Sequence, residues 1–243
     1  MTGNPQPCPL RVVTWNVHAC VGGDGVFDPD RVASIVNGLS PDIVALQEVD
    51  SRRRGARRLD VFAFLRDRIG GHAAEAKTIT TPDGDYGHMI FSRWPLRRVR
   101  VHDVSVAARE PRAIIDMEAL FPFGPVRVIG AHFGLRRSER RSQTRALSVL
   151  METDPEGAAI IAGDFNELRR LSATHIALSP GFKTASIAAT YPSRYPIFAL
   201  DRIWCRAPLS VRQSWVERAA RAGSDHLPLI ADLDWIRPRN YDF

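Results

Sequence analysis

Carboxylate, imidazole and amide side chains stand at the ends of apolar runs in this sequence. The stretch SDHLP (224–228) places Asp225 beside His226 immediately before the apolar run LPLIADL. A half-buried carboxylate or imidazole costs free energy unless it is paired or holds a metal ion. The polar residues found at the edges of predicted strands are Asn16, Gln47, Glu48, His132, Asp164, Asn166, Asp201, Asp225 and His226.

Several of these placements have a simpler structural explanation when taken alone. Asp164 and Asn166 are spaced for an Asx turn that opens a helix. Asp201 beside Arg202 would form a surface ion pair worth about 0–1 kcal/mol, and His132 alone would be a buried core histidine. Because α/β folds build their sites at strand ends, the joint occurrence of these residues favours one shared site.

The residue types suit a hard divalent cation and phosphate chemistry. Carboxylate and amide oxygens are preferred by Mg²⁺ or Mn²⁺, and Glu48 with Asn16 would supply the few protein ligands that Mg²⁺ takes. The cysteines Cys8, Cys20 and Cys205 are odd in number and lack zinc-type spacing, so neither zinc nor a disulfide framework is expected. Histidines beside carboxylates add acid, base and phosphate-contact groups, which together predict metal-assisted phosphoryl hydrolysis.

The elements that must position these residues follow an α/β pattern. Residues 10–18 and 42–49 are predicted to be buried strands, and the segment 28–39 between them a helix capped by Asp28 with Pro29 in its first turn. Short spacings over 86–133 indicate hairpins, so mixed sheets are expected. Further strands are predicted at 86–92, 97–106, 112–120, 125–133, 158–164, 198–205, 208–216 and 227–233, and helices at 138–152, with Ser138 as a possible cap, and 166–178.

The composition is that of a basic globular chain. It has 243 residues, 44% of them hydrophobic, and a formal net charge of +6. A basic surface suits an anionic partner such as a phosphoester substrate or DNA. All but two of the 33 basic residues are arginine, a bias that codon composition could also produce. The run RRRGARR (52–58) is either a solvated loop or a basic lip around an anionic substrate.

The chain is predicted to form one domain. We expect residues 10–236 to fold together, with a flexible N-terminus at 1–9 and a tail at 237–243. No signal peptide is evident, and no apolar run approaches the roughly 20 residues that span a bilayer. A cytoplasmic monomer without a membrane span is therefore expected.

Six segments, in this order, resemble the endonuclease/exonuclease/phosphatase superfamily, the deoxyribonuclease I-like group, and in particular its small bacterial members. They are TWNVH (14–18), LQEV (46–49), AHFG (131–134), GDFN (163–166), LDRIW (200–204) and SDHLP (224–228). The resemblance implies a four-layer α/β sandwich, in which two packed mixed β-sheets are flanked by helices.

The resemblance also implies roles for individual residues. Glu48 and Asn16 match the family's main metal ligands, and Asp225 matches an acidic residue near the metal. The other matched residues have catalytic roles. Asp164 and Asn166 position water and phosphate, His226 contacts the phosphate or takes a proton, Asp201 orients His226, and His132 is a second histidine for acid catalysis or phosphate contact.

One position departs from the family pattern. Where the family often has Tyr-Gly-Asn, with the Asn near the phosphate, this chain has Tyr86-Gly87-His88. Tyr86 and His88 are therefore candidate substrate-phosphate contacts, and the role of His88 is open because it can also carry a charge. Arg112 is either a further phosphate contact or a surface strand residue.

The activity expected from the resemblance is Mg²⁺- or Mn²⁺-dependent phosphoester hydrolysis, with a nuclease acting on DNA as the leading hypothesis. The alternative is a phosphatase or phosphodiesterase acting on a small phosphorylated molecule or a lipid headgroup. A non-catalytic binding module is disfavoured because every matched polar residue is present.

Overall fold

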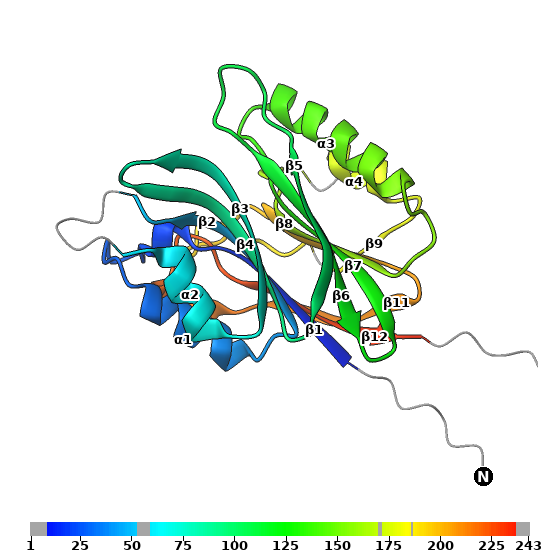
Figure 1. Cartoon of the computed structure of the whole chain (residues 1–243), viewed down its shortest axis with the longest axis horizontal. Helices are drawn as coiled ribbons and strands as arrows, with labels where there is room; N and C mark the ends of the chain where they lie inside the picture. Colours follow the sequence, from blue (N-terminus) through cyan, green and yellow to red (C-terminus); the bar gives the residue numbers. More distant parts are fainter. Residues whose placement is uncertain (1–8, 53–58, 170–171, 186, 237–243) are drawn as a thin grey trace, which may run out of the picture.

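The computed structural model describes residues 9–52, 59–169, 172–185 and 187–236, which form two six-stranded sheets packed face to face (Figure 1). Helices cover the outer face of each sheet, so the layers run helix, sheet, sheet, helix. The four-layer α/β sandwich expected from the sequence is confirmed.

The first sheet has the strand order β11-β12-β1-β2-β4-β3. Within it β1 and β2 are parallel, and the other neighbours are antiparallel. Its strands are β1 (Pro9–Asn16), β2 (Ile43–Asp50), β3 (His72–Thr81), β4 (Gly84–Ser92), β11 (Leu209–Val216) and β12 (Leu229–Trp235).

The second sheet has the order β5-β6-β7-β8-β10-β9. Here β7 and β8 are the parallel pair, so each sheet is mixed, as the hairpin spacings predicted. Its strands are β5 (Leu96–Asp103), β6 (Ala113–Phe121), β7 (Gly124–His132), β8 (Ala159–Asp164), β9 (Lys183–Thr184) and β10 (Asp201–Arg206).

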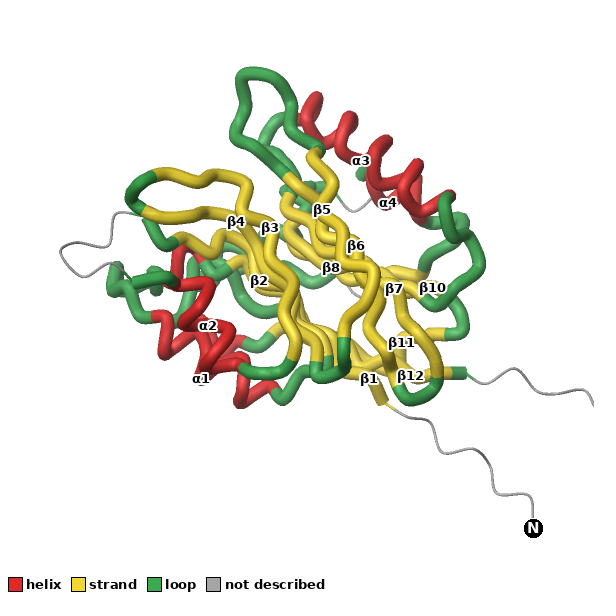
Figure 2. Tube along the Cα trace, in the orientation of Figure 1, coloured by secondary structure: helices red, strands yellow, loops and turns green. Residues whose placement is uncertain are grey.

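Each parallel pair is joined by a crossover that contains a helix. The helix α1 (Pro29–Leu39) connects β1 to β2 and packs beside α2 (Val61–Ile69) on the first sheet, whereas α3 (Arg137–Glu152) connects β7 to β8 and packs beside α4 (Ala173–Leu178) on the second (Figure 2). The Asp28 carboxylate caps α1 by accepting from the Arg31 backbone N–H at 2.9 Å, as predicted. Short 3₁₀ turns lie at His18–Cys20 and Arg218–Ala222.

Three hydrophobic clusters hold the layers together. The central cluster lies between the sheets and includes Val12, Ile90, Val128 and Ile160, all essentially inaccessible to solvent. The two outer clusters fix α1 and α2 to the first sheet, and α3 and α4 to the second. Burying one such side chain contributes about 1.5–3 kcal/mol, so this packing fixes where the strand ends lie.

Among the helices and strands, α2, β3 and the two-residue β9 were missed by the sequence analysis. In α2, Val61, Phe62 and Leu65 are buried on one face and the Asp60 carboxylate accepts from the Ala63 N–H, a helical pattern that the sequence does carry. The strand β3 is rich in Ala, Thr, Lys and Glu. Such a composition has little intrinsic strand preference. The strand forms because it pairs with β4.

Several predicted boundaries were wrong. The helix expected at 166–178 occupies only Ala173–Leu178, and α3 begins at Arg137, where the Glu139 carboxylate accepts from the Arg136 N–H in place of a Ser138 cap. Pro9 belongs to β1 and pairs with Asp234. Residues 1–8, 53–58 and 237–243 lie outside the described residues, and with them most of the flanking segments and of the run RRRGARR.

Candidate active site

The strand register brings the predicted polar residues to one edge of the sandwich. Asn16 ends β1 beside Gln47 of the parallel strand β2. His132 ends β7 beside Asp164 at the end of β8, and Asp201 begins the antiparallel strand β10 opposite Asp164. Carboxyl ends of parallel strands and amino ends of their antiparallel neighbours share one sheet edge, which explains why residues far apart in sequence meet here.

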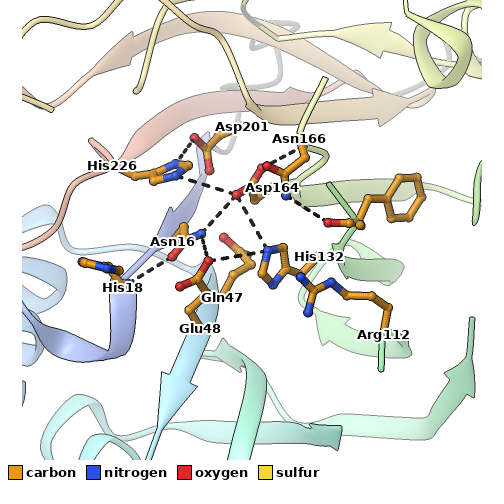
Figure 3. Close-up of polar contacts among 12 residues, drawn as sticks. Asn16, His18, Gln47, Glu48, Arg112, His132, Asp164, Asn166, Asp201 and His226 are labelled. Carbon is orange, nitrogen blue, oxygen red and sulfur yellow. Dashed lines mark hydrogen bonds and ion pairs between the residues drawn. The ribbon is translucent and has the colours of Figure 1, made fainter. Parts of the chain in front are cut away.

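Asn16 joins the two sheets at this edge (Figure 3). Its side-chain Nδ2 donates to Glu48 Oε1 at 2.8 Å and to Asp164 Oδ2 at 3.1 Å. Its Oδ1 accepts from the His18 backbone N–H at 3.0 Å. In this orientation Asn16 holds two carboxylates in place and directs its oxygen away from them, so the metal-ligand role expected for Asn16 stays a prediction.

Glu48 is directed into the site by a β-bulge. Leu46 pairs with Met89 and Val49 with Gly87, so two residues of β2 stand opposite one residue of β4. Glu48 has a φ of 56°, in the left-handed region that a residue with a side chain rarely adopts. Bulges and strained backbone of this kind occur at sites where a side chain must be re-aimed.

His226 and Asp201 form a buried hydrogen-bonded pair. His226 Nδ1 lies 2.9 Å from Asp201 Oδ2, and the Thr190 hydroxyl donates to the same oxygen at 2.5 Å. Burial alone would lower the pKa of His226, but the charge of Asp201 and its hydrogen bond, aided by Asp164, raise that pKa to about 10. His226 is therefore a cation near neutral pH.

Asp164 lies at the centre of the cluster and is 1% exposed. Its Oδ1 accepts from the Asn166 backbone N–H at 2.9 Å, and its Oδ2 lies 3.8 Å from His226 Nε2. Burial, together with the nearby charge of Asp201, raises the pKa of Asp164 to about 6. A carboxylate with such a pKa remains ionised at neutral pH and is a stronger base than an exposed aspartate.

His132 lies between the two sheets' carboxylates and is uncharged. Its Nε2 is 3.7 Å from Glu48 Oε1 and 3.9 Å from Asp164 Oδ2. Burial and the adjacent charge of Arg112 hold the pKa of His132 well below its usual value. A neutral imidazole can offer one N–H to a phosphate oxygen.

Asn166 is held by its own hydrogen bonds. Its φ of 51° is left-handed, and its Nδ2 donates to the Phe133 carbonyl at 2.9 Å. This turn takes the chain out of β8 and explains why no helix starts at residue 166.

The three residues of uncertain role lie beside this cluster. Tyr86, His88 and Arg112 are all buried. Burial, with a contribution from Arg112, lowers the pKa of His88 to about 4, so His88 is neutral. Arg112 pairs with Glu110 and lies next to His132 (Figure 3), so its surface-residue explanation is excluded by its burial.

The charges around Glu48 fit a divalent cation. Burial raises the pKa of Glu48 and the negative charge of Asp225 adds to this shift, although the hydrogen bond from Asn16 opposes it. The Glu48 and Asp225 side chains are 27% and 37% exposed, so both can be reached from solvent. A divalent ion bound by these two carboxylates would offset the cost of burying Glu48.

A second group of possible ligands comprises Asp164, Asp201 and His226, whose ligand atoms lie within 4.8 Å of one another. The proton on His226 already supplies the positive charge between these carboxylates. The predicted ligands Glu48 and Asp225 lie outside this group, and their metal-ligand role stays a prediction.

Three residues near the cluster were not predicted as site residues. His18 Nδ1 lies 3.8 Å from Asp225 Oδ1, Thr190 binds Asp201, and the Tyr191 ring packs 4.8 Å from the His226 ring. His18 lies inside the TWNVH segment, which was a signal for it. Thr190 and Tyr191 lie 11 and 10 residues before Asp201, and their residue types alone do not mark them as site residues.

Two packed mixed sheets with a buried carboxylate–imidazole cluster at one edge define a deoxyribonuclease I-like phosphoester hydrolase. The chain belongs to the Endonuclease/Exonuclease/phosphatase family, whose model matches residues 13–226. Members of this family are divalent-metal-dependent nucleases, phosphatases and phosphodiesterases.

Similar proteins cover nearly the whole chain. YbhP, an uncharacterized protein of Escherichia coli K12, is 28% identical over 96% of this chain and 99% of its own length. Among solved structures, an endonuclease/exonuclease/phosphatase from Beutenbergia cavernae has a TM-score of 0.80 at 21% identity, covering 93% of this chain and 72% of that one.

Two further solved structures have more specific names. A humanized D. rerio TDP2 has a TM-score of 0.69 at 17% identity, over 93% and 98% of the two chains. The mannosyl-6-phosphatase Bt3783 of Bacteroides thetaiotaomicron has a TM-score of 0.74 at 16% identity, over 92% and 99%. These likenesses show a common fold. The described part of this chain has no helix long and apolar enough to cross a bilayer.

Proposed function

We propose that this protein is a Mg²⁺- or Mn²⁺-dependent phosphodiesterase acting on nucleic acid, with DNA as the leading substrate. The observation that carries the proposal is the placement of Asp164 within 3.8 Å of a His226 ring that is held by Asp201. A strong carboxylate base beside a fixed cation is the arrangement that attack of water on a phosphodiester requires.

In this mechanism Asp164 takes a proton from the attacking water. The hydrogen bonds from Asn16 and Asn166 fix the orientation of the carboxylate, and its raised pKa makes it a better proton acceptor. The water oxygen then forms a bond to phosphorus as the bond to the ester oxygen on the opposite side breaks, and the departing alkoxide takes a proton from solvent.

The His226 imidazolium stabilises the negative charge that develops on the phosphoryl oxygens. Its Nδ1–H is held by Asp201, so Nε2–H faces the reacting centre. Neutral His132 and the buried guanidinium of Arg112 supply further donors to the non-bridging oxygens. Fixed donors of this kind are already oriented before the reaction, which is why they lower the barrier.

Glu48 and Asp225, with Asn16 as the remaining predicted ligand, would hold the divalent cation. When bound, the cation supplies positive charge to a phosphate oxygen and acidifies bound water. Oxygen ligands favour Mg²⁺ or Mn²⁺ over softer metals.

Nucleic acid is favoured as substrate by the net charge of +6 and by unpaired arginines near the site. Arg137, Arg141 and Arg169 line a cavity of about 310 Å³ together with Glu167, the residue after Asn166, and none of these arginines forms a salt bridge within the described part of the chain.

The alternative is a phosphatase acting on a small phosphorylated molecule. It is favoured by the likeness to a mannosyl-6-phosphatase. A hydrolysis panel separates the two. It would contain single-stranded DNA, plasmid, RNA, inositol phosphates, a sugar phosphate and a phospholipid, each with Mg²⁺ or Mn²⁺ and with an EDTA control. Metal-dependent cleavage of nucleic acid supports the proposal, and hydrolysis of small esters alone would replace it with the alternative.

A further inference from the structure

Backbone hydrogen bonds join the loop Tyr191–Phe198, with the sequence YPSRYPIF, to the SDHLP segment. Its two ends pair as an antiparallel bridge. The Ser193 N–H donates to the Asp225 carbonyl at 2.6 Å, and the Leu227 N–H donates to the Thr190 carbonyl at 2.9 Å. These backbone bonds on both sides of His226 hold the loop at a fixed place beside the site.

The loop presents side chains in two zones. At its base, the Tyr191 ring packs against the His226 ring, with centroids 4.8 Å apart. At its tip, Tyr195 and Ile197 are 70% and 69% exposed. The Arg194 guanidinium carbon lies 5.6 Å from the centre of the Tyr195 ring. Two large apolar side chains two positions apart, on a loop fastened next to a catalytic histidine, are well placed to contact a ligand.

We propose that this loop is a stacking platform for an unpaired nucleobase adjacent to the scissile phosphate, so that the preferred substrate is single-stranded. An exposed tyrosine with a neighbouring arginine is the kind of surface on which bases stack, because every base has a flat π-face. In a duplex the bases are already stacked and paired, so only an unpaired base can reach Tyr195. This inference rests on the proposed function.

The charges around the site favour a nucleic-acid strand over a lipid. In Figure 3 His226 and Asn166 lie on opposite sides of the central carboxylate. The stacking loop is attached on the His226 side. The cavity lined by Arg137, Arg141 and Arg169 is also lined by Glu167, the residue that follows Asn166 in the chain. A strand crossing the site would place a base on the loop and further phosphates among these arginines. A membrane-inserting surface would need a continuous apolar patch, whereas Arg194 interrupts this one.

Binding of fluorescein-labelled oligothymidylate, measured by anisotropy in EDTA so that no cleavage occurs, tests the platform directly. We expect Tyr195→Ala to weaken binding at least about fivefold, and Ile197→Ala to weaken it less. Val149→Ala, which changes a 62% exposed side chain on α3, is the matched control and should have no effect. A matched abasic oligonucleotide should bind the wild type more weakly and be insensitive to Tyr195→Ala.

Equal wild-type affinity for the thymidylate and abasic strands, or for duplex and single strand, would overturn the inference. Loss of binding to phosphatidylglycerol vesicles in Tyr195→Ala, with strand binding unchanged, would also overturn it and indicate a membrane contact. Failure of the proposed function is distinct. It would appear as base-dependent binding without metal-dependent cleavage. If cleavage is metal-dependent but its rate is the same in Tyr195→Ala and on the abasic strand, only the stacking platform is refuted.

Discussion

At the scale of single residues, the proposed chemistry depends on a histidine that stays charged while buried. Burial by itself favours the neutral imidazole, and the Asp201 carboxylate behind the ring reverses that preference. Thr190 donates to the same carboxylate oxygen, so Asp201 is itself held in place. The result is a positive charge held beside Asp164, where negative charge would develop in the proposed mechanism.

Replacing this histidine should therefore have a large effect on rate. We expect His226→Ala to lower kcat by at least about a thousandfold, because it removes a preorganised charge. Asp201→Asn keeps the ring and should be milder, at about ten- to a hundredfold. Steady-state kinetics on an oligonucleotide would measure both variants. His72→Ala, a change at an exposed histidine on β3, is the control, and a larger loss in Asp201→Asn than in His226→Ala would contradict the orienting role.

At the scale of elements, side-chain clamps hold the strands that carry the site. Arg11 of β1 donates to both carboxylate oxygens of Asp232 in β12, at 2.7 and 3.0 Å. Gln213 of β11 donates to the same carboxylate at 2.8 Å. This clamp joins three adjacent strands of the first sheet, one of which ends at Asn16.

The clamp predicts how stability changes with acid. The hydrogen bonds from Arg11 lower the pKa of Asp232 in the folded state, so its contribution is present above the unfolded value of about 3.9 and is lost as the pH falls through the folded value. Asp232→Asn should cost about 1 kcal/mol of unfolding free energy at pH 7, and less at about pH 3, below the unfolded value. Urea denaturation at both pH values measures this, with the exposed Asp67→Asn as control. A cost that persists undiminished at low pH would exclude the ionic clamp.

The same scale shows what sequence could and could not predict. The helix α1 was predictable because Asp28 and Pro29 mark its start locally. The sequence predicted that Glu48 lies at the end of a strand. It could not predict where the Glu48 side chain points, because the bulge that directs it depends on pairing between β2 and β4. The pairing of Asp201 with His226, 25 residues away, came from the family resemblance. The burial of His88 and Arg112 follows from packing across strands, which no local pattern records.

At the scale of the whole molecule, two similar halves meet at the site. Each sheet contributes a parallel strand pair joined by a helical crossover, and the packed faces between them bring Asn16 of one sheet within 3.1 Å of Asp164 of the other. The site therefore exists only when both sheets are packed. The chain carries a formal net charge of +6, which should attract a polyanion.

Salt dependence should report this attraction. If the arginine-lined cavity receives phosphates, the affinity for single-stranded DNA should fall steeply with salt, with a slope of about −0.7 per phosphate contacted. The double variant Arg137→Ala/Arg141→Ala should lower the magnitude of that slope by roughly one to two contacts. Anisotropy titrations over a salt series would measure it, with Arg212→Ala on β11 as control. An unchanged slope would mean that phosphates do not enter the cavity.

The most direct test of the account is the metal-dependent hydrolysis of nucleic acid by wild type and Glu48→Gln. Glutamine keeps the size of the side chain and removes the charge that would hold the cation. We expect the wild type to cleave with Mg²⁺ or Mn²⁺ and to stop in EDTA, and Glu48→Gln to remain folded without measurable turnover. A Glu48→Gln protein as active as the wild type would contradict the assignment of this edge as a metal-dependent active site.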